Sequence, residues 1–352
     1  MNTTATHPQS RSGQEWQEFY ERLSRSGTAP LWEVLGQIVP SQPLRACVPA
    51  FWSYDEVRPM LMEAGRMITA KEAERRVLIL ENPGARGQSR ITQSLYAGLQ
   101  LVLPGEEAAT HRHTASALRF VIESEGGYTA VDGERTTMHP GDFILTPSWS
   151  WHDHGNSGAK PVIWLDGLDI PIVNFFDAGF FEHHAQDLQP VTRPQGDALA
   201  RYGANMLPLD DEQQRPATPL FTYPYARSRE ALERVFRSGP VDVCHGVKMQ
   251  FTNPATGSYT MPTIGAFLQM LPRGFDGLPY RSTEGAIYCV VEGRGQSRVG
   301  EETFLWKEHD VFAIPSWYAV SHQAESEAVL FSFSDRPVQK MLGIWREQAP
   351  ML

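Results

Sequence analysis

Residues 105–156 read GEEAATHRHTASALRFVIESEGGYTAVDGERTTMHPGDFILTPSWSWHDHGN. The stretch opens with His111 and His113, one residue apart, and closes with His152 and His154 at the same spacing. Between the two pairs lie alternating apolar runs interrupted by GG, DG and PG turns, a pattern typical of antiparallel strands joined by hairpins. This segment therefore predicts a small β-barrel whose strands carry two pairs of histidines.

The histidine pairs suggest a metal site. Side chains at positions i and i+2 of a strand face the same side of a sheet, so 111–119 is expected to present His111, His113 and Arg119 on one face. His152 and His154 share a face for the same reason, and a closed barrel would bring both faces together inside it. A single histidine is more often an ordinary core or surface residue. Two pairs flanking strands favour metal binding, because neutral imidazole is the commonest metal ligand.

The same stretch resembles the first of the two cupin motifs. Gly105, His111 and His113 match that motif, whereas the position that usually holds glutamate is occupied by Ala117 or Leu118. The resemblance implies a double-stranded β-helix barrel in which no carboxylate joins the metal ligands.

The second cupin motif is matched by Gly141, Pro147, His152 and Asn156, with Trp149 in place of its second glycine. Together the two motifs imply three neutral ligands. These are His111, His113 and His152. An ion held in this way keeps its full charge and three open positions, as in the facial triad of non-haem iron oxygenases.

Longer segments narrow the resemblance to ring-cleaving cupins. Residues 94–106 (SLYAGLQLVLPGE), 162–171 (VIWLDGLDIP) and 253–267 (NPATGSYTMPTIGAF) are similar to those of the gentisate 1,2-dioxygenase family. Salicylate and 1-hydroxy-2-naphthoate dioxygenases are near relatives, and the likeness covers most of the chain. It implies one Fe(II) per subunit, a small aromatic acid and O2 as substrates, extradiol-type cleavage of gentisate to maleylpyruvate, and a homotetramer.

Three polar residues are candidates for catalysis. A guanidinium inside a barrel is costly unless an anion pairs with it, so Arg119 is expected either to pair with Asp166 or to bind the substrate carboxylate or a reduced-oxygen intermediate. The resemblance gives Asp166 a further role as acceptor for the 5-hydroxyl of gentisate. His154 is expected either to support the site by a hydrogen bond or to bind substrate and move a proton during O–O cleavage.

Further residues are candidates for binding the substrate. The resemblance adds Arg75 for the carboxylate, with a solvated charge in the run 71–76 as the alternative. Residues 91–103 are expected to form a strand that places Tyr96, Gly98 and Gln100 along the ring pocket. Gly98 would let the backbone approach closely. Tyrosine at position 96 favours gentisate over salicylate, because family members differ there.

An internal repeat predicts a second barrel. Residues 117–149 parallel 286–317, with one residue fewer in the second copy. The ligand positions of the first copy become Tyr280, Ser282 and Val320, none of which suits a divalent metal. Only His322 remains, and it matches His154. The second barrel is therefore expected to be metal-free and structural.

The expected fold is mainly β, a bicupin of two tandem jelly-roll barrels with N-terminal and linker helices. Its predicted segments are 1–89 (helical or extended, with residues 1–13 disordered), 90–175 (catalytic barrel), 176–244 (linker with a helix) and 245–352 (second barrel). Trp16, Phe19, Tyr20 and Leu23 lie at helical spacing in residues 13–27, and a further helix is expected over 227–239, ending at Gly239. Residues 77–82 (VLILEN) are expected to form a short buried strand.

Composition limits the partners. A net charge of −10 argues against non-specific binding of nucleic acid. Cys47, Cys244 and Cys289 are too few and too widely spaced for a disulfide framework, and they suit a reducing cytosol. No stretch approaches the roughly 18 apolar residues of a membrane span, and no secretory signal is visible. The expected location is the cytoplasm, with no membrane partner.

Three functions stay open. The first is an Fe(II) gentisate dioxygenase, and the second is a related dioxygenase acting on salicylate or 1-hydroxy-2-naphthoate. The third, from another class, is a metal-binding bicupin without turnover that stores or senses a small ligand. The three histidines beside Arg119 argue against this third function.

Overall fold

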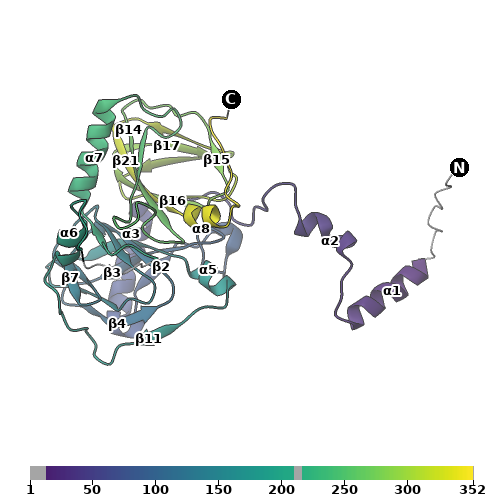
Figure 1. Cartoon of the computed structure of the whole chain (residues 1–352), viewed down its shortest axis with the longest axis horizontal. Helices are drawn as coiled ribbons and strands as arrows, with labels where there is room; N and C mark the ends of the chain where they lie inside the picture. Colours follow the sequence, from purple (N-terminus) through teal and green to yellow (C-terminus); the bar gives the residue numbers. More distant parts are fainter. Residues whose placement is uncertain (1–12, 210–215, 352) are drawn as a thin grey trace. The chain divides into compact units, whose positions relative to one another are not determined.

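The structure of this chain is a computed structural model that describes residues 13–209 and 216–351. It divides into two units, Met1–Leu44 and Arg45–Leu352 (Figure 1). The disorder expected for residues 1–13 falls almost wholly outside the described part.

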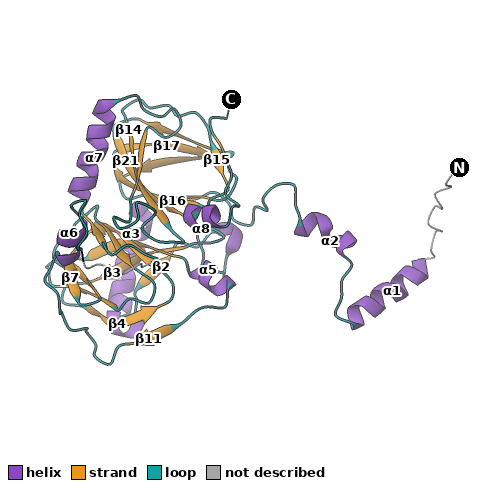
Figure 2. Ribbon diagram, viewed as in Figure 1, coloured by secondary structure: helices purple, strands orange, loops and turns teal. Residues whose placement is uncertain are grey.

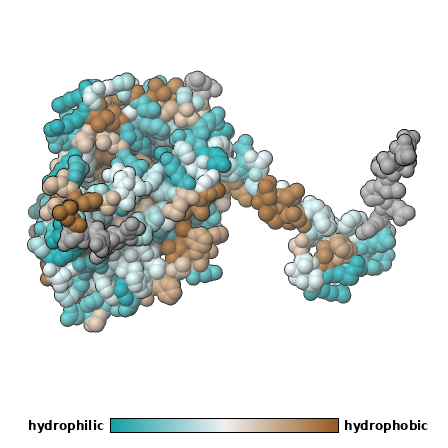
Figure 3. Space-filling view, viewed as in Figure 1, coloured by the Kyte–Doolittle hydropathy of each residue, from teal (hydrophilic) through white to brown (hydrophobic). Residues whose placement is uncertain are grey.

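The described part of the first unit contains two helices, α1 (Gly13–Arg25) and α2 (Leu31–Ile38). The predicted aromatic stripe forms on α1, where the rings of Trp16 and Tyr20 lie 5.6 Å apart. The Tyr20 hydroxyl donates a hydrogen bond to Glu33 Oε1 at 2.5 Å, which links the two helices. Neither helix buries a residue. The exposed apolar side chains of α2 are Leu31, Trp32, Leu35 and Ile38 (Figure 3).

Two antiparallel sheets form the first barrel of the second unit (Figure 2). The strands of one sheet, in spatial order, are β12 (Thr222–Tyr223), β8 (Phe143–Thr146), β5 (Ala117–Glu123), β10 (Val162–Leu168), β3 (Tyr96–Val102) and β2 (Val77–Ile79). Those of the other are β11 (Phe181–His183), β4 (Glu107–His113), β9 (His152–Asn156), β6 (Gly127–Val131) and β7 (Glu134–Thr137). The predicted hairpin pattern of residues 105–156 is confirmed.

The second barrel repeats this arrangement. Its larger sheet orders β1 (Ala50–Trp52), β19 (Val311–Ile314), β16 (Ala286–Glu292), β21 (Ala328–Ser334), β14 (Gly265–Leu271) and β13 (Val247–Gln250). The smaller sheets contain β18 (Glu302–Lys307), β17 (Arg294–Val299) and β20 (Val320–Ala324), and the pair β15 (Arg281–Ser282) and β22 (Glu347–Gln348). The fold is the mainly β bicupin that the repeat predicted.

Strands from outside the predicted barrel segments complete both large sheets. β2 pairs with β3 although it precedes residue 90, and β12 pairs with β8 although it lies in the predicted linker. β1 pairs with β19 of the second barrel across more than two hundred residues of sequence. Such pairings are set by the edge that each sheet leaves open, which local sequence does not encode.

Helices cover the outside of the barrels. They are α3 (Tyr54–Met67), α4 (Ala70–Ala73), α5 (Ile170–Phe175), α6 (Asp197–Tyr202), α7 (Tyr225–Ser238) and α8 (Arg336–Met341), with a 3-10 turn at Pro83–Ala85. As predicted, α7 ends just before Gly239. No helix in the described ranges is long and apolar enough to cross a membrane.

The two barrels share a hydrophobic core. The rings of Phe120 on β5 and Phe331 on β21 stack at 4.2 Å with an interplanar angle of 11°. Tyr54 at the start of α3 also joins the barrels, because its N–H donates to Asp310 Oδ1 at 2.8 Å and its hydroxyl donates to Glu123 Oε1 at 2.6 Å. Side chains alternate along a strand, so Phe120 faces the second barrel and its neighbour Arg119 faces the interior of the first.

Two local predictions need correction. The strand expected over 91–103 begins only at Tyr96, because the N–H of Ile91 donates to the carbonyl of Leu95 and closes a turn. The segment VLILEN, expected to be a buried strand, supplies β2 at the edge of its sheet. Ile79 in β2 is 42% exposed, and the buried residue Leu80 follows the strand.

Candidate active site and metal centre

Three histidines converge inside the first barrel. His111 and His113 project from β4 and His152 from β9, and His111 lies directly opposite His152 in the ladder. One candidate ligand nitrogen from each ring lies within 4.8 Å of the others. The predicted triad is therefore brought together, and among the described residues it is the only such group of three.

A β-bulge in β4 makes this convergence possible. Ala108 pairs with His154, but His111 pairs with His152, so three steps on β4 match two steps on β9. Opposite residues in a ladder share a face, and without the extra residue His152 would lie opposite Thr110. The side chains of His111 and His113 would then face the opposite side of the sheet from that of His152. Bulges commonly re-aim side chains beside active sites in this way.

Backbone carbonyls fix the orientation of two ligands. His113 Nδ1–H donates to the carbonyl of Ala115 at 2.7 Å, and His152 Nδ1–H donates to that of Ser150 at 3.0 Å. Each ring therefore presents an unprotonated Nε2, as is typical of histidines that bind metal. His152 Nε2 is buried and has no hydrogen-bond partner in the described part of the chain. A buried acceptor without a partner is costly, which a bound cation would relieve.

The ligand set is neutral. Burial lowers the pKa of His113 to about 4, and burial followed by the charge of Arg75 lowers the pKa of His111 to about 2. Burial also lowers the pKa of His152 well below its ordinary value. Ala117 and Leu118, at the position of the usual glutamate, are buried and apolar. Three neutral nitrogens without a carboxylate fit a divalent transition metal with open coordination positions.

Arg119 lies beside the triad as part of a buried ion pair. It stands opposite Asp166 of β10, with 3.8 Å between Arg119 Nε and Asp166 Oδ1. Arg119 donates to Thr146 Oγ1, and Trp164 Nε1–H donates to Asp166 Oδ1 at 2.8 Å. Burial raises the pKa of Asp166 to about 6, although the Arg119 charge opposes this shift.

The ion pair leaves part of the guanidinium unsatisfied. Arg119 Nε is buried and has no hydrogen-bond partner among the described residues. The internal pairing considered from the sequence is therefore present, and it still leaves a donor for a substrate anion. Arg119 reaches the site from β5, whereas β4 already ends at His113. The expectation of one continuous face over 111–119 was wrong.

β3 and β2 shape the adjoining wall. Gly98 stands opposite Asp166 in the β3–β10 ladder, and Tyr96 and Gln100 share its face of β3. A Cβ atom built on Gly98 would lie 2.5 Å from Val77 Cγ1 and 3.1 Å from Tyr96 Oη. A larger residue there would require the Val77 side chain to shift. Sequence reasoning missed Val77, because its place in the wall depends on an edge-strand pairing.

The family model described as a cupin domain matches residues 98–168. The chain is 57% identical over 333 residues to gentisate 1,2 dioxygenase 1 of Aquipseudomonas alcaligenes, with 95% of this chain and 96% of the relative covered. It is 35% identical to gentisate 1,2-dioxygenase of Ralstonia sp., with 98% of both chains covered. The chain belongs to the gentisate 1,2-dioxygenase family.

Solved structures agree with this assignment. Salicylate 1,2-dioxygenase from Pseudoaminobacter salicylatoxidans, described as adducts with gentisate, superposes with a TM-score of 0.91 at 32% identity, and covers 99% of this chain and 96% of its own. Ring-cleaving relatives also include the 5-aminosalicylate 1,2-dioxygenase of Comamonas sp., 35% identical over 94% of this chain and 89% of the relative. The enzyme is thus a ring-cleaving cupin dioxygenase.

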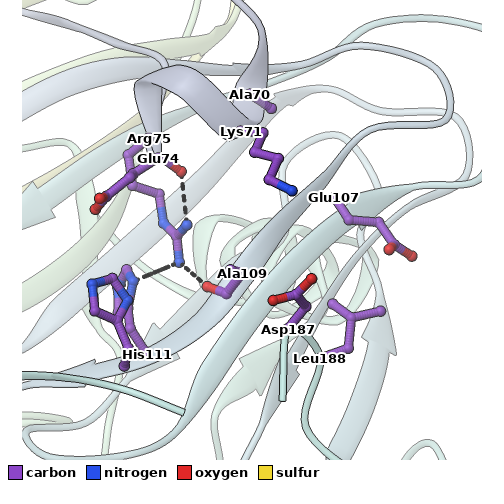
Figure 4. Close-up of a pocket in the computed structure, with 10 residues that line it drawn as sticks. Ala70, Lys71, Glu74, Arg75, Glu107, Ala109, His111, Asp187 and Leu188 are labelled. Carbon is purple, nitrogen blue, oxygen red and sulfur yellow. Dashed lines mark hydrogen bonds between the residues drawn. The ribbon is translucent and has the colours of Figure 1, made fainter. Parts of the chain in front are cut away.

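In this dioxygenase Arg75 directly contacts His111, one of the three candidate metal ligands. Its Nη2 lies 2.8 Å from the carbonyl of Ala109, which belongs to the bulged part of β4, and 2.8 Å from His111 Nδ1 (Figure 4). The predicted alternative of a solvated charge is wrong. A guanidinium only donates, so His111 Nδ1 is the acceptor in this contact. Metal binding through Nε2 would need the proton on Nδ1, so Arg75 and a metal ion place opposite demands on the ring.

A cavity of about 250 Å³ opens beside His111 and Arg75 (Figure 4). Lys71, Glu107, Asp187 and His183 also line it. Sequence analysis did not single out His183, because it has no ligand spacing. It reaches the cavity through β11, a three-residue exposed strand paired with β4, and so short a strand carries no alternation that a pattern search could detect.

His154 completes the interior of the site. Its ring lies 5.7 Å from that of His152, and it is fully buried. His154 Nδ1 is 2.8 Å from Thr129 Oγ1, whereas Nε2 has no partner in the described ranges. His154 is therefore a neighbour of the ligands with a free nitrogen, as its spacing predicted.

The second barrel has the same backbone pairings as the site of the first barrel, but with other side chains at the ligand positions. Tyr280 pairs with Val320 as His111 pairs with His152. The N–H of Trp317 donates to the carbonyl of Ser282 at 2.7 Å, and that of Trp149 donates to the carbonyl of His113 at 2.8 Å. These contacts support the predicted correspondence of Tyr280, Ser282 and Val320 with the three ligands. His322 fills the position of His154 and is fully buried.

Replacing His111 or His152 with alanine is expected to lower the affinity for Fe(II) by more than about 100-fold, since even partners outside the ligand set contribute about 10–100-fold to metal sites. Metal content after gel filtration and titration with Fe(II) would measure the loss. His139→Ala, at a histidine whose side chain is 70% exposed, is the control and should bind iron normally. Full iron occupancy in the His152→Ala protein would show that this ring is not a ligand.

Proposed function

We propose that this enzyme is an Fe(II)-dependent gentisate 1,2-dioxygenase that converts gentisate and O2 to maleylpyruvate, with one iron per subunit. One observation carries the proposal. Three neutral imidazoles, two buried and one half-buried, converge on one point beside a guanidinium that still has an unused donor. The 57% identity to a gentisate dioxygenase supports gentisate as the substrate.

The reaction, rather than the ligand set, favours iron over zinc, because three histidines can hold either metal. Triplet dioxygen reacts slowly with a closed-shell aromatic ring, so the reaction needs a metal that changes oxidation state. Fe(II) held by His111, His113 and His152 would supply that chemistry together with open positions for the substrate and dioxygen, whereas Zn(II) has no redox chemistry. The protein contributes the neutral ligands and an interior from which solvent is largely excluded.

Two arginines are proposed to bind the substrate carboxylate. Arg119 has a buried Nε–H without a partner, and Arg75 lies at the cavity beside His111. Charge-assisted hydrogen bonds of this kind are about twice as strong as neutral ones. The chain carries a net charge of −10, so this local pair of cations is what allows an anionic substrate to bind.

The remaining site residues are proposed to orient the ring. Asp166 would accept a hydrogen bond from the 5-hydroxyl, because only one of its oxygens is committed to Trp164. His154 would contact a hydroxyl through its free Nε2. Tyr96, Gly98 and Gln100 would form one wall, in which the missing side chain of Gly98 leaves room for Val77 and for the Tyr96 hydroxyl.

A salicylate or 1-hydroxy-2-naphthoate dioxygenase is the second candidate. The solved structures with a TM-score of about 0.9 are salicylate 1,2-dioxygenase, and a 1-hydroxy-2-naphthoate 1,2-dioxygenase is 35% identical over 87% of this chain. Tyr96 and the higher identity to a gentisate dioxygenase favour gentisate. A metal-binding bicupin without turnover has no support, because the curated relatives over most of the chain are ring-cleaving dioxygenases.

Two further proposals concern assembly and location. The family resemblance supports a homotetramer, and the small number of cysteines supports the cytoplasm. Neither a nucleic acid nor a membrane is proposed as a partner, which agrees with the net charge of −10.

The substrate proposal is tested by anaerobic reconstitution with Fe(II), followed by oxygen-electrode assays with gentisate, salicylate and 1-hydroxy-2-naphthoate. We expect kcat/KM for gentisate to exceed the other values by at least about tenfold, which corresponds to one charge-assisted hydrogen bond more in the transition state. Ultraviolet spectra should show maleylpyruvate. Fast turnover of salicylate with slow turnover of gentisate would contradict the proposal.

Arg75→Ala is expected to separate metal binding from substrate binding. Fe(II) affinity should stay the same or rise, because a neighbouring charge and a competing donor are removed from His111. KM for gentisate should rise by about 10–100-fold with the loss of a charge-assisted hydrogen bond. Arg112→Ala is the control, since Arg112 lies next to His111 on β4 but pairs with Glu182 instead. A loss of iron in Arg75→Ala without a change in KM would refute this assignment.

A further inference from the structure

Thr129 is the only residue in the described part of the chain that forms a hydrogen bond with the side chain of His154. Thr129 lies on β6 opposite His154 of β9 and is completely buried. Its Oγ1 is 2.8 Å from His154 Nδ1 and 3.1 Å from the backbone carbonyl of Asp153. Two groups, a ring nitrogen and a carbonyl, therefore meet at a single hydroxyl.

The direction of these hydrogen bonds follows from what each group can do. The carbonyl of Asp153 can only accept, so it takes the one hydrogen that the Thr129 hydroxyl has to give. The Thr129 oxygen is then left with lone pairs only, and it can accept from His154. With the hydroxyl donating to Asp153, His154 carries its hydrogen on Nδ1. In the neutral ring the other nitrogen, Nε2, has no hydrogen and is an acceptor.

The residues around Asp153 hold its backbone in place. The Asp153 carboxylate, on the outer face of β9, accepts from Thr110 Oγ1 at 2.9 Å and from Gln189 Nε2 at 3.0 Å. The carbonyl that receives the Thr129 hydrogen therefore belongs to a well-anchored residue.

We propose that Thr129 is a positioning residue that presents His154 Nε2 to the active site as a hydrogen-bond acceptor for a hydroxyl of the aromatic substrate. His154 Nε2 is buried, has no partner in the described ranges and adjoins the metal ligand His152. A phenolic hydroxyl is the donor that this nitrogen lacks. The inference rests on the proposed function, because it takes the substrate to be a hydroxylated aromatic acid.

The second barrel offers an internal comparison. His322 stands in the place of His154, and its Nδ1 lies 2.7 Å from Ser297 Oγ. There the hydroxyl accepts from Trp306 Nε1–H at 2.9 Å, and His322 Nε2 already faces the hydroxyl of Tyr280 at 3.4 Å. The contact between histidine and hydroxyl is common to both barrels. Only in the first barrel does the hydroxyl hydrogen bind a carbonyl while Nε2 remains free.

The test compares Thr129→Val, which keeps the shape and removes the hydroxyl, with Thr129→Ser, which keeps the hydroxyl. Nitrogen NMR of full-length protein labelled with ¹⁵N-histidine, both metal-free and loaded with Zn(II), reports which ring nitrogen carries hydrogen. The His154 signals are assigned by their absence in His154→Gln. We expect the hydrogen on Nδ1 in the wild type and in Thr129→Ser, and on Nε2 in most molecules of Thr129→Val.

Binding provides the second readout. Under anaerobic conditions, Thr129→Val should bind gentisate about tenfold more weakly than the wild type, the effect of one hydrogen bond. Its affinity for benzoate, which has no hydroxyl, should change less than about twofold. Thr129→Ser should restore gentisate binding. A merely structural role would instead weaken both ligands equally, and that result would overturn the proposal.

The wild-type spectrum alone tests the role of Thr129 if Thr129→Val does not fold. Hydrogen on Nε2 of His154 in the wild type would refute it directly. Failure of the proposed function gives a different result, because the wild type would then consume no oxygen with gentisate whatever the ring tautomer. Turnover of gentisate by the wild type, with Nδ1 still protonated in Thr129→Val, would leave the function standing and refute the role of Thr129.

Discussion

A one-residue bulge in β4 is the constraint on which the site depends. It shifts the ladder so that His111, rather than Thr110, stands opposite His152. Because side chains alternate in a strand, this single step brings both histidine pairs to the same face. The bulge also turns the carbonyl of Ala109 toward Arg75, which contacts His111 and lines the adjoining cavity.

The rest of the molecule packs around this interior and supports the strands that line it. β5 presents Arg119 inward and Phe120 outward, and Phe120 stacks on Phe331 of the second barrel. The second barrel thus packs against the outer face of the sheet that contains β5. Its own interior is filled by tyrosines such as Tyr280 and Tyr288. Duplication supplied two similar frames, and only the first combines three imidazoles with a buried guanidinium.

Much of the fold and the metal triad could be predicted from the sequence, because their signals are local. The spacing of His111 and His113 follows the period of a strand, and the repeat of residues 117–149 predicted the second barrel. The bulge, the short strand β11, and the places of Val77 and Thr129 could not be predicted, since each depends on how distant strands pair. The face predicted over 111–119 failed for the same reason: β4 and β5 lie in different sheets.

The central claim is that one iron ion is held by three neutral imidazoles in the first barrel. Anomalous diffraction at the iron absorption edge, from crystals of the Fe(II)-loaded enzyme, tests it most directly. One peak per chain is predicted among the Nε2 atoms of His111, His113 and His152, with Arg75 moved away from His111. A peak in the second barrel, or three rings turned away from a common point, would contradict the account.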